Sequence, residues 1–136
     1  MKLAITAAII CAAAMLFLLF PGLVLARDNG QWEGSDPAIR MWYQGLMQPD
    51  NPSMSCCGEA DGYFAEKLEV HGDKVYAIIT DDRPDEPLGR KHVPVGTKIL
   101  VPPHKIKYDK GNPTGRAIIF LAPDMSVYCY VNGTGI

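Results

Sequence analysis

The sequence predicts a mainly β (α+β) protein: a small antiparallel sheet or half-open barrel of about five strands, preceded by one amphipathic helix. Three observations support this prediction. Apolar and polar residues begin to alternate with period 2 at Tyr63, and the pattern recurs as far as Val131. Glycines and prolines divide that region into short segments joined by turns. The stretch before it has the apolar spacing of a helix instead.

The 136 residues leave room for one domain. Residues 3–20 are uncharged and follow Lys2, and Pro21-Gly22 and Val24-Leu25-Ala26 come next. A basic start, an apolar run, a helix breaker and a small residue are typical of a signal peptide. We therefore expect residues 1–26 to be removed, leaving 27–136 as a single small disulfide-linked domain. An uncleaved membrane anchor is the alternative, because the apolar run nears spanning length.

The expected helix follows Asp36. Asp36 suits the N-cap and Pro37 the first helical position. Apolar residues then recur at i, i+3, i+4 and i+7, which predicts one face packed on the sheet. Pro49 is expected to stop the helix. The residues of the apolar face are Ile39, Trp42, Tyr43 and Leu46.

The strands are predicted from alternation and from turns. His71-Gly72-Asp73 is expected to join two strands in a hairpin. The run 117–121 is apolar at every position, which predicts a central strand. The expected strands are 63–70, 74–80, 98–101, 117–121 and 127–131.

The last predicted strand contains Cys129. Alternation should place Cys129 on one apolar face with Val127 and Val131, pointing into the core. Tyr128 and Tyr130 should then point outward.

Three cysteines remain after the leader. An exported domain of this size gains stability from a disulfide. We expect Cys129 to pair with either Cys56 or Cys57, since adjacent side chains in an extended segment diverge. The remaining thiol is either buried, paired between molecules or reactive.

Charge is divided unevenly along the chain. Residues 27–89 hold 5 basic and 13 acidic side chains, whereas residues 90–116 hold 7 basic ones against Asp109 alone. The basic segment predicts a surface for an anionic partner. Pairing of its lysines with the acidic 81–86 loop is the alternative. The candidate anion-binding residues are Lys98, Lys105, Lys107, Lys110 and Arg116.

Other polar residues are weaker candidates. Glu59 and Asp61 lie in the Cys-Cys-Gly-Glu-Ala-Asp loop, where paired carboxylates can do acid–base work or simply form turns. His92 and His104, with the remaining thiol, are the residues available for a metal. Because no ligand pair has metal spacing, we predict no metal and no cofactor. A metal-binding, thiol-redox or hydrolytic protein centred on this loop remains the alternative function.

Three stretches carry a resemblance: Ser55-Cys56-Cys57-Gly58-Glu59-Ala60-Asp61, Gly111-Asn112-Pro113-Thr114-Gly115 and Val127-Tyr128-Cys129-Tyr130-Val131. Together they resemble small exported bacterial proteins of unknown function with a Cys-Cys pair and a late cysteine in the last strand. The resemblance implies a compartment and no reaction.

The predicted function is therefore a non-catalytic envelope or periplasmic binding module. Without a recognisable catalytic geometry, the sequence favours binding over catalysis. We expect a periplasmic or secreted protein whose partner is an anionic cell-envelope component or another envelope protein. No nucleic-acid motif is present, and membrane contact is expected only through an uncleaved N-terminal segment.

Overall fold

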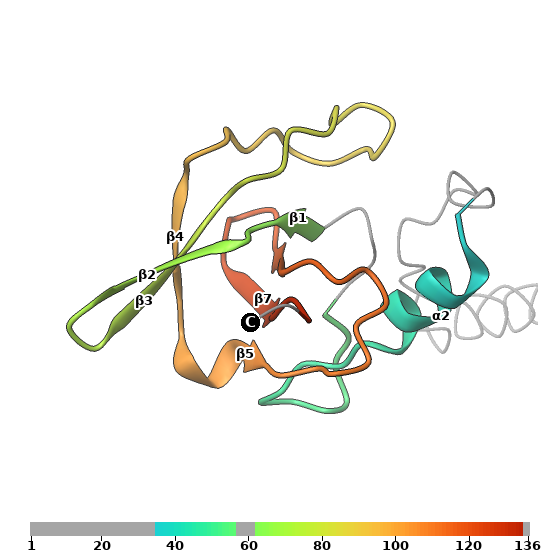
Figure 1. Cartoon of the computed structure of the whole chain (residues 1–136), viewed down its shortest axis with the longest axis horizontal. Helices are drawn as coiled ribbons and strands as arrows, with labels where there is room; N and C mark the ends of the chain where they lie inside the picture. The colour runs from blue at the N-terminus through green and yellow to red at the C-terminus, as the bar shows by residue number, and fades with distance from the viewer. Residues whose placement is uncertain (1–34, 57–61, 135–136) are drawn as a thin grey trace, which may run out of the picture.

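A computed structural model describes residues 35–56 and 62–134 (Figure 1). The described elements run in the order α2 (Pro37–Gly45), β1 (Gly62–Phe64), β2 (Lys67–His71), β3 (Lys74–Ile78), β4 (Lys98–Val101), a 3₁₀ turn (Pro103–Lys105), β5 (Ile106–Lys107), β6 (Ile118–Leu121) and β7 (Val127–Val131). The predicted signal peptide lies outside the described residues. Among the residues that are described, no helix has the length and apolar character to cross a membrane.

The strands of residues 62–134 form two open sheets, so the mainly β prediction is confirmed, and within this range they do not close into a barrel. One sheet has four strands in the order β1-β6-β7-β5, and the other has three in the order β2-β3-β4. All described pairings are antiparallel except that of β5 with β7, which is parallel. The prediction of a single antiparallel sheet was therefore wrong, because there are two sheets and one of the pairings is parallel.

The extra sheet arises because the predicted strand 63–70 is two strands. Phe64 ends β1, and Ala65 is completely buried, with its N–H donated to Ala117 O at 3.0 Å. Glu66 is exposed, and the chain then enters β2 in the other sheet. Period-2 alternation continues through such a bend, so the sequence pattern does not reveal it.

The four-stranded sheet is covered on both faces. One face packs on the three-stranded sheet through a core that includes Ile119, Ala77 and Val101. The other face packs on α2 through Tyr43 and Phe120, whose ring centroids are 5.9 Å apart. The molecule therefore has three layers, with every residue of β6 buried as predicted for a central strand.

The helix begins as predicted. The Asp36 carboxylate accepts the N–H of Ala38 at 2.7 Å, and Pro37 occupies the first turn. The helix ends at Gly45, before Pro49, because Leu46 is already extended. Tyr43 and Leu46 are buried against the sheet, with Ile39 and Trp42 partly buried beside them, which confirms the predicted face.

β7 departs from simple alternation. The register shifts between Phe120 and Leu121, which leaves Tyr128 as an extra residue in β7. Val127 therefore packs in the core between the sheets, whereas Cys129 and Val131 pack beneath the helix. The expectation that these three share a face was wrong for Val127.

Tyr130 is also buried, which corrects the prediction that it points outward. Its hydroxyl donates to Ala65 O at 3.2 Å in the core between the sheets. A strand with one layer on each face has no solvent side, so both parities of β7 are covered.

Candidate functional site

A disulfide joins Cys56 to Cys129, which selects Cys56 from the two predicted partners. The Cα atoms are 5.5 Å apart and 73 residues separate the cysteines. Both cysteines are buried beneath α2. The bond is consistent with an oxidising extracellular or periplasmic location. Cys57, Glu59 and Asp61 lie outside the described residues.

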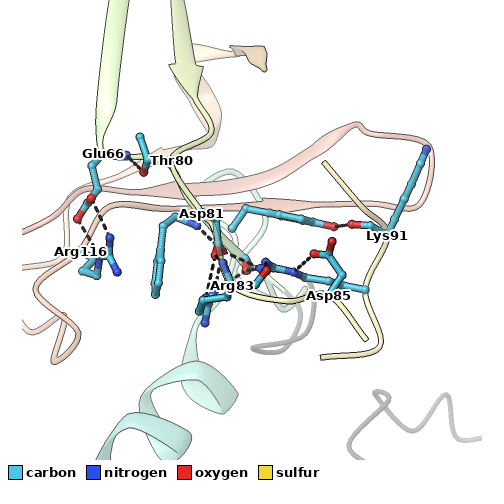
Figure 2. A network of polar contacts seen from close by, with 11 residues as sticks. Glu66, Thr80, Asp81, Arg83, Asp85, Lys91 and Arg116 are labelled. Atoms are coloured by element: carbon cyan, nitrogen blue, oxygen red, sulfur yellow. Dashed lines mark hydrogen bonds and ion pairs between the residues drawn. The ribbon is translucent and has the colours of Figure 1, made fainter. Parts of the chain in front are cut away.

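A buried ion-pair network gathers around Asp81, directly after β3 (Figure 2). Asp81 Oδ2 accepts from Arg83 Nη2 and from Arg90 Nη1, each at 2.7 Å. The same oxygen accepts the N–H of Phe64 at 3.0 Å, and Arg90 Nε donates to Asp85 at 2.8 Å. Two carboxylates therefore balance two guanidinium groups.

The network fastens the 81–91 loop to β1. Arg83 Nη2 and Arg90 Nη1 both donate to Gly62 O, at 3.2 and 3.0 Å. The Tyr63 hydroxyl donates to Lys91 O at 2.6 Å. The bonds to Gly62 O cover the open edge of β1. Arg83 and Arg90 therefore stabilise the attachment of the 81–91 loop to this strand.

Ionisation of Asp81 is favoured despite its position. Burial alone would raise the pKa of Asp81, but the hydrogen bonds from Arg83 and Arg90 outweigh burial and hold this pKa well below its usual range. Burial likewise opposes the charge on Arg90, and the bonds to Asp81 and Asp85 raise the pKa of Arg90 above its usual value. A carboxylate held ionised in this way is a poor proton carrier near neutral pH.

Phe64 lies between two guanidinium groups. Arg83 and Arg116 each have Cζ 3.8 Å from the ring centroid, and two such groups fit only on opposite faces of one ring. Arg116 also pairs with Glu66, through Nε at 2.9 Å and Nη2 at 3.0 Å. Arg116 was a candidate for anion binding, and here it is engaged within the fold.

The other basic candidates separate into different places. Lys105 Nζ contacts Gln48 Oε1 at 2.8 Å and Asp50 Oδ1 at 2.9 Å, while Lys107 Nζ donates to Met47 O at 3.2 Å. These two lysines hold the loop that follows α2. Lys98 Nζ instead pairs with Glu69 at 2.6 Å on the three-stranded sheet, and Lys110 is exposed. None of these lysines pairs with the 81–86 loop among the described contacts, so the alternative pairing is not formed there.

The two candidate histidines are likewise apart. His92 Nδ1 lies 2.6 Å from Asp85 Oδ2, and His104 Nε2 lies 3.9 Å from Asp50 Oδ2. The hydrogen bond with His92 holds the pKa of Asp85 below its usual range. Within the part of the chain that the structure describes, no three histidine, cysteine or acidic side chains lie close enough to hold a metal ion.

The outer face of the three-stranded sheet contains a hollow that the sequence interpretation missed. It has a volume of about 260 Å³ and is lined by His71, Tyr76 and Lys98. Side chains of the opposite parity, such as Ala77 and Val101, are buried in the core, so the lining residues face outward.

The pairing of β2 with β3 and of β3 with β4 places both apolar and basic side chains around this hollow. Residues that face each other across the strands share a face. Lys98 from the basic segment is thereby joined by two lysines from the acidic half of the chain. The facing sets are Lys67–Ile78–Lys98, Glu69–Tyr76–Leu100 and His71–Lys74. Pairing the hairpin about Gly72-Asp73 would have placed Lys67 and Lys74 on the face of Tyr76 from the sequence, but not Lys98, whose strand pairs in a register that the hairpin does not contain.

No protein-family model, no curated protein and no solved structure matches this chain. The resemblance to small exported bacterial proteins therefore stays a prediction.

Proposed function

We propose that the chain is an exported, non-catalytic binding module of the bacterial envelope. Its binding surface is the outer face of β2-β3-β4, and its ligand is an anionic cell-wall polymer. The observation that carries this proposal is the hollow formed by Tyr76, Lys98 and His71 on that face.

The charges of the surface favour an anion. Three lysines, Lys67, Lys74 and Lys98, share the face with one carboxylate, Glu69, for a net charge of +2 when His71 is neutral. Lys98 holds the pKa of Glu69 below its usual value by hydrogen bonding. An incoming carboxylate or phosphate would compete with Glu69 for Lys98.

The apolar part of the surface favours a ring. Tyr76 is the central residue of its row, with exposed Leu100 beside it on β4. Tyrosine offers a flat apolar ring with a polar end, which suits the apolar face of a sugar. A solvated sheet face is usually polar, so an aromatic and an exposed leucine here support a binding role.

Co-sedimentation with isolated cell walls tests this proposal. The wild type should bind at low salt and be released at high salt, because charges more than about 10 Å apart are screened at 0.1 M. A variant with Lys67, Lys74 and Lys98 changed to Gln should lose binding, and Tyr76→Ala should weaken it. The control carries Lys91→Gln and Lys110→Gln, two exposed lysines elsewhere, and its charge-matched sheet counterpart carries Lys74→Gln and Lys98→Gln.

Three results would reject the proposal. They are no binding at low salt, binding indifferent to the sheet variants, and binding to anionic vesicles alone. Loss of binding in Lys105→Glu/Lys107→Glu but not in the sheet variants would place the surface on the basic segment instead.

The same purified protein reports on export and on the alternative function. An intact mass that begins at Arg27 is expected for periplasmic protein. Thiol titration with metal analysis should find an unreactive Cys57 and no bound metal. A reactive thiol or a stoichiometric metal would favour the redox or metal alternative.

A further inference from the structure

The outer edge of β2 has unpaired backbone groups. β2 is an edge strand, and Figure 1 shows the β2–β3 hairpin projecting from the body of the molecule. His71 and Lys74 flank a two-residue turn, and such a flanking pair exchanges hydrogen bonds. Alternation from there points the N–H and C=O of Leu68 and Val70 away from β3. Among residues 35–56 and 62–134, no hydrogen bond reaches these groups.

The same two residues expose apolar side chains. Leu68 is 43% exposed and Val70 is 68% exposed. Both have the inward parity of their sheet, but the hairpin extends beyond the core that covers Ala77. An edge that is both unpaired and apolar is a template for another strand.

The other exposed edges of the sheets are less suited to pairing. The edge of β1 is covered by Asp81 and Arg90, which bond to Phe64 N and Gly62 O. β4 has four residues and is followed at once by Pro102-Pro103, which interrupt a ladder, and β5, the other edge of the four-stranded sheet, has only two residues. β2 is therefore the edge best able to accept a strand.

We propose that β2 pairs antiparallel with β2 of a second copy of this chain, with Val70 on the twofold axis. This inference is independent of the proposed ligand. In this register Val70 meets Val70 of the second copy and Glu69 faces His71, while Lys67 lies opposite the turn, where β2 has already ended. The Glu69–His71 pair joins an acid to a base and occurs twice, so the surface is complementary to itself.

Neighbouring registers are less favourable for the exposed apolar or the charged side chains. With Glu69 on the axis, two Glu69 carboxylates would face each other, which places like charges opposite. With Leu68 on the axis, Lys67 would face Glu69, but Val70, the more exposed of the two apolar side chains, would face the charged Glu66, whose carboxylate is already held by Arg116.

The resulting dimer is a six-stranded sheet closed by its own symmetry. An antiparallel edge contact has its twofold axis perpendicular to the sheet, so both outer faces lie on the same side. The two hollows lined by Tyr76 and Lys98 would therefore open in one direction.

Sedimentation equilibrium of periplasmic protein, without ligand, tests the interface. From micromolar to millimolar concentration we expect reversible monomer–dimer association. Val70→Lys should weaken association at least tenfold, because two like charges would meet on the axis. Val95→Lys is the matched control, since Val95 is also exposed and lies before β4. A strictly monomeric protein, or a dimer indifferent to Val70→Lys, would overturn the proposal.

Charge exchange and cross-linking test the register. Glu69→Lys should weaken association roughly fivefold or more, and adding His71→Glu should restore it. In a Cys57→Ser background, Val70→Cys should form a covalent dimer, because facing Cα atoms lie about 5.5 Å apart, within disulfide range. Val95→Cys should not. Failure of both tests would reject this register.

Hydrogen exchange distinguishes pairing of the β2 edge with a second copy from pairing with another segment. Protection of the Leu68 and Val70 amides should rise with protein concentration. Protection that is independent of concentration would mean that another segment of the same chain covers β2, and open-ended polymers would mean that β2 pairs with β4. Either result would overturn the proposal.

Discussion

Arg90 and Asp81 form an ion pair that is almost completely withdrawn from solvent. Nη1 and Oδ2 are 2.7 Å apart, and the side chains are 2% and 0% exposed. Each charge compensates the burial of the other, and Arg90 also stacks over Tyr63, with Cζ 4.5 Å from the ring centroid. The pair joins the loop after β3 to the edge of β1, and therefore one sheet to the other.

Removing Arg90 should be much more damaging than removing its neighbour. Arg90→Leu leaves Asp81 buried with part of its compensation lost, which typically costs about 3–5 kcal/mol. Arg83 is 27% exposed, and Arg83→Leu leaves Arg90 in place, so we expect a loss of about 1–3 kcal/mol. Urea unfolding at pH 7 measures both. Equal losses would show that the two arginines are interchangeable.

Asp81 should make the protein sensitive to acid. Its folded-state pKa is depressed, so its contribution to stability is present above the unfolded pKa, near 3.9, and is lost as the pH falls through lower values. The free energy of unfolding should therefore decline below about pH 4. Asp81→Asn should be less stable at pH 7 but show a flatter profile between about pH 5 and 2. An unchanged slope would contradict this assignment.

Tyr130 should make the protein sensitive to alkali. Burial raises the pKa of Tyr130 to about 12. A raised folded-state pKa contributes stability below the unfolded pKa, near 10, that is lost as the pH rises towards about 12. Tyr130→Phe should lower stability at pH 7 by about 1 kcal/mol through the lost bond to Ala65. It should also remove the tyrosinate-linked part of the alkaline decline, as followed by absorbance and denaturant unfolding.

Breaking the disulfide should cost a large share of the stability. The bond closes a loop of 73 residues between Cys56 and Cys129, for which the expected loss is about 2–5 kcal/mol. The double variant Cys56→Ala/Cys129→Ala tests this by urea unfolding, with Cys57→Ser as the control expected to retain wild-type stability. Peptide mapping that joins Cys57 to Cys129 would contradict the pairing.

Several local features were predictable because their causes are local. Asp36 and Pro37 begin a helix through capping chemistry that needs only adjacent residues. The run Ile118–Leu121 is buried on both sides, as its uninterrupted apolar character indicated. Gly72-Asp73 closes the hairpin as its turn residues predicted, with Gly72 at φ +64°.

Other features depended on registers that no local pattern contains. The displacement of Val127 follows from how β7 pairs with β6 around a bulge, and the burial of Tyr130 follows from the layers on both faces of that sheet. The choice of Cys56 follows from the path of the loop after α2, which places Cys56 beneath the helix beside Cys129. A bulge reverses side-chain parity after one extra residue, and alternation read along one strand does not specify it.

The candidate site likewise has one feature that was predictable from the sequence and one that depended on the register of the strands. The sequence alone determined that basic side chains gather between residues 90 and 116, because their order along the chain is directly visible. Only the tertiary structure decided which of them share a surface. Lys105 and Lys107 hold the loop after α2, while Lys98 joins Lys67 and Lys74 around Tyr76. The physical reason is that an antiparallel sheet groups residues by register across strands, so its faces gather side chains that are far apart in the chain.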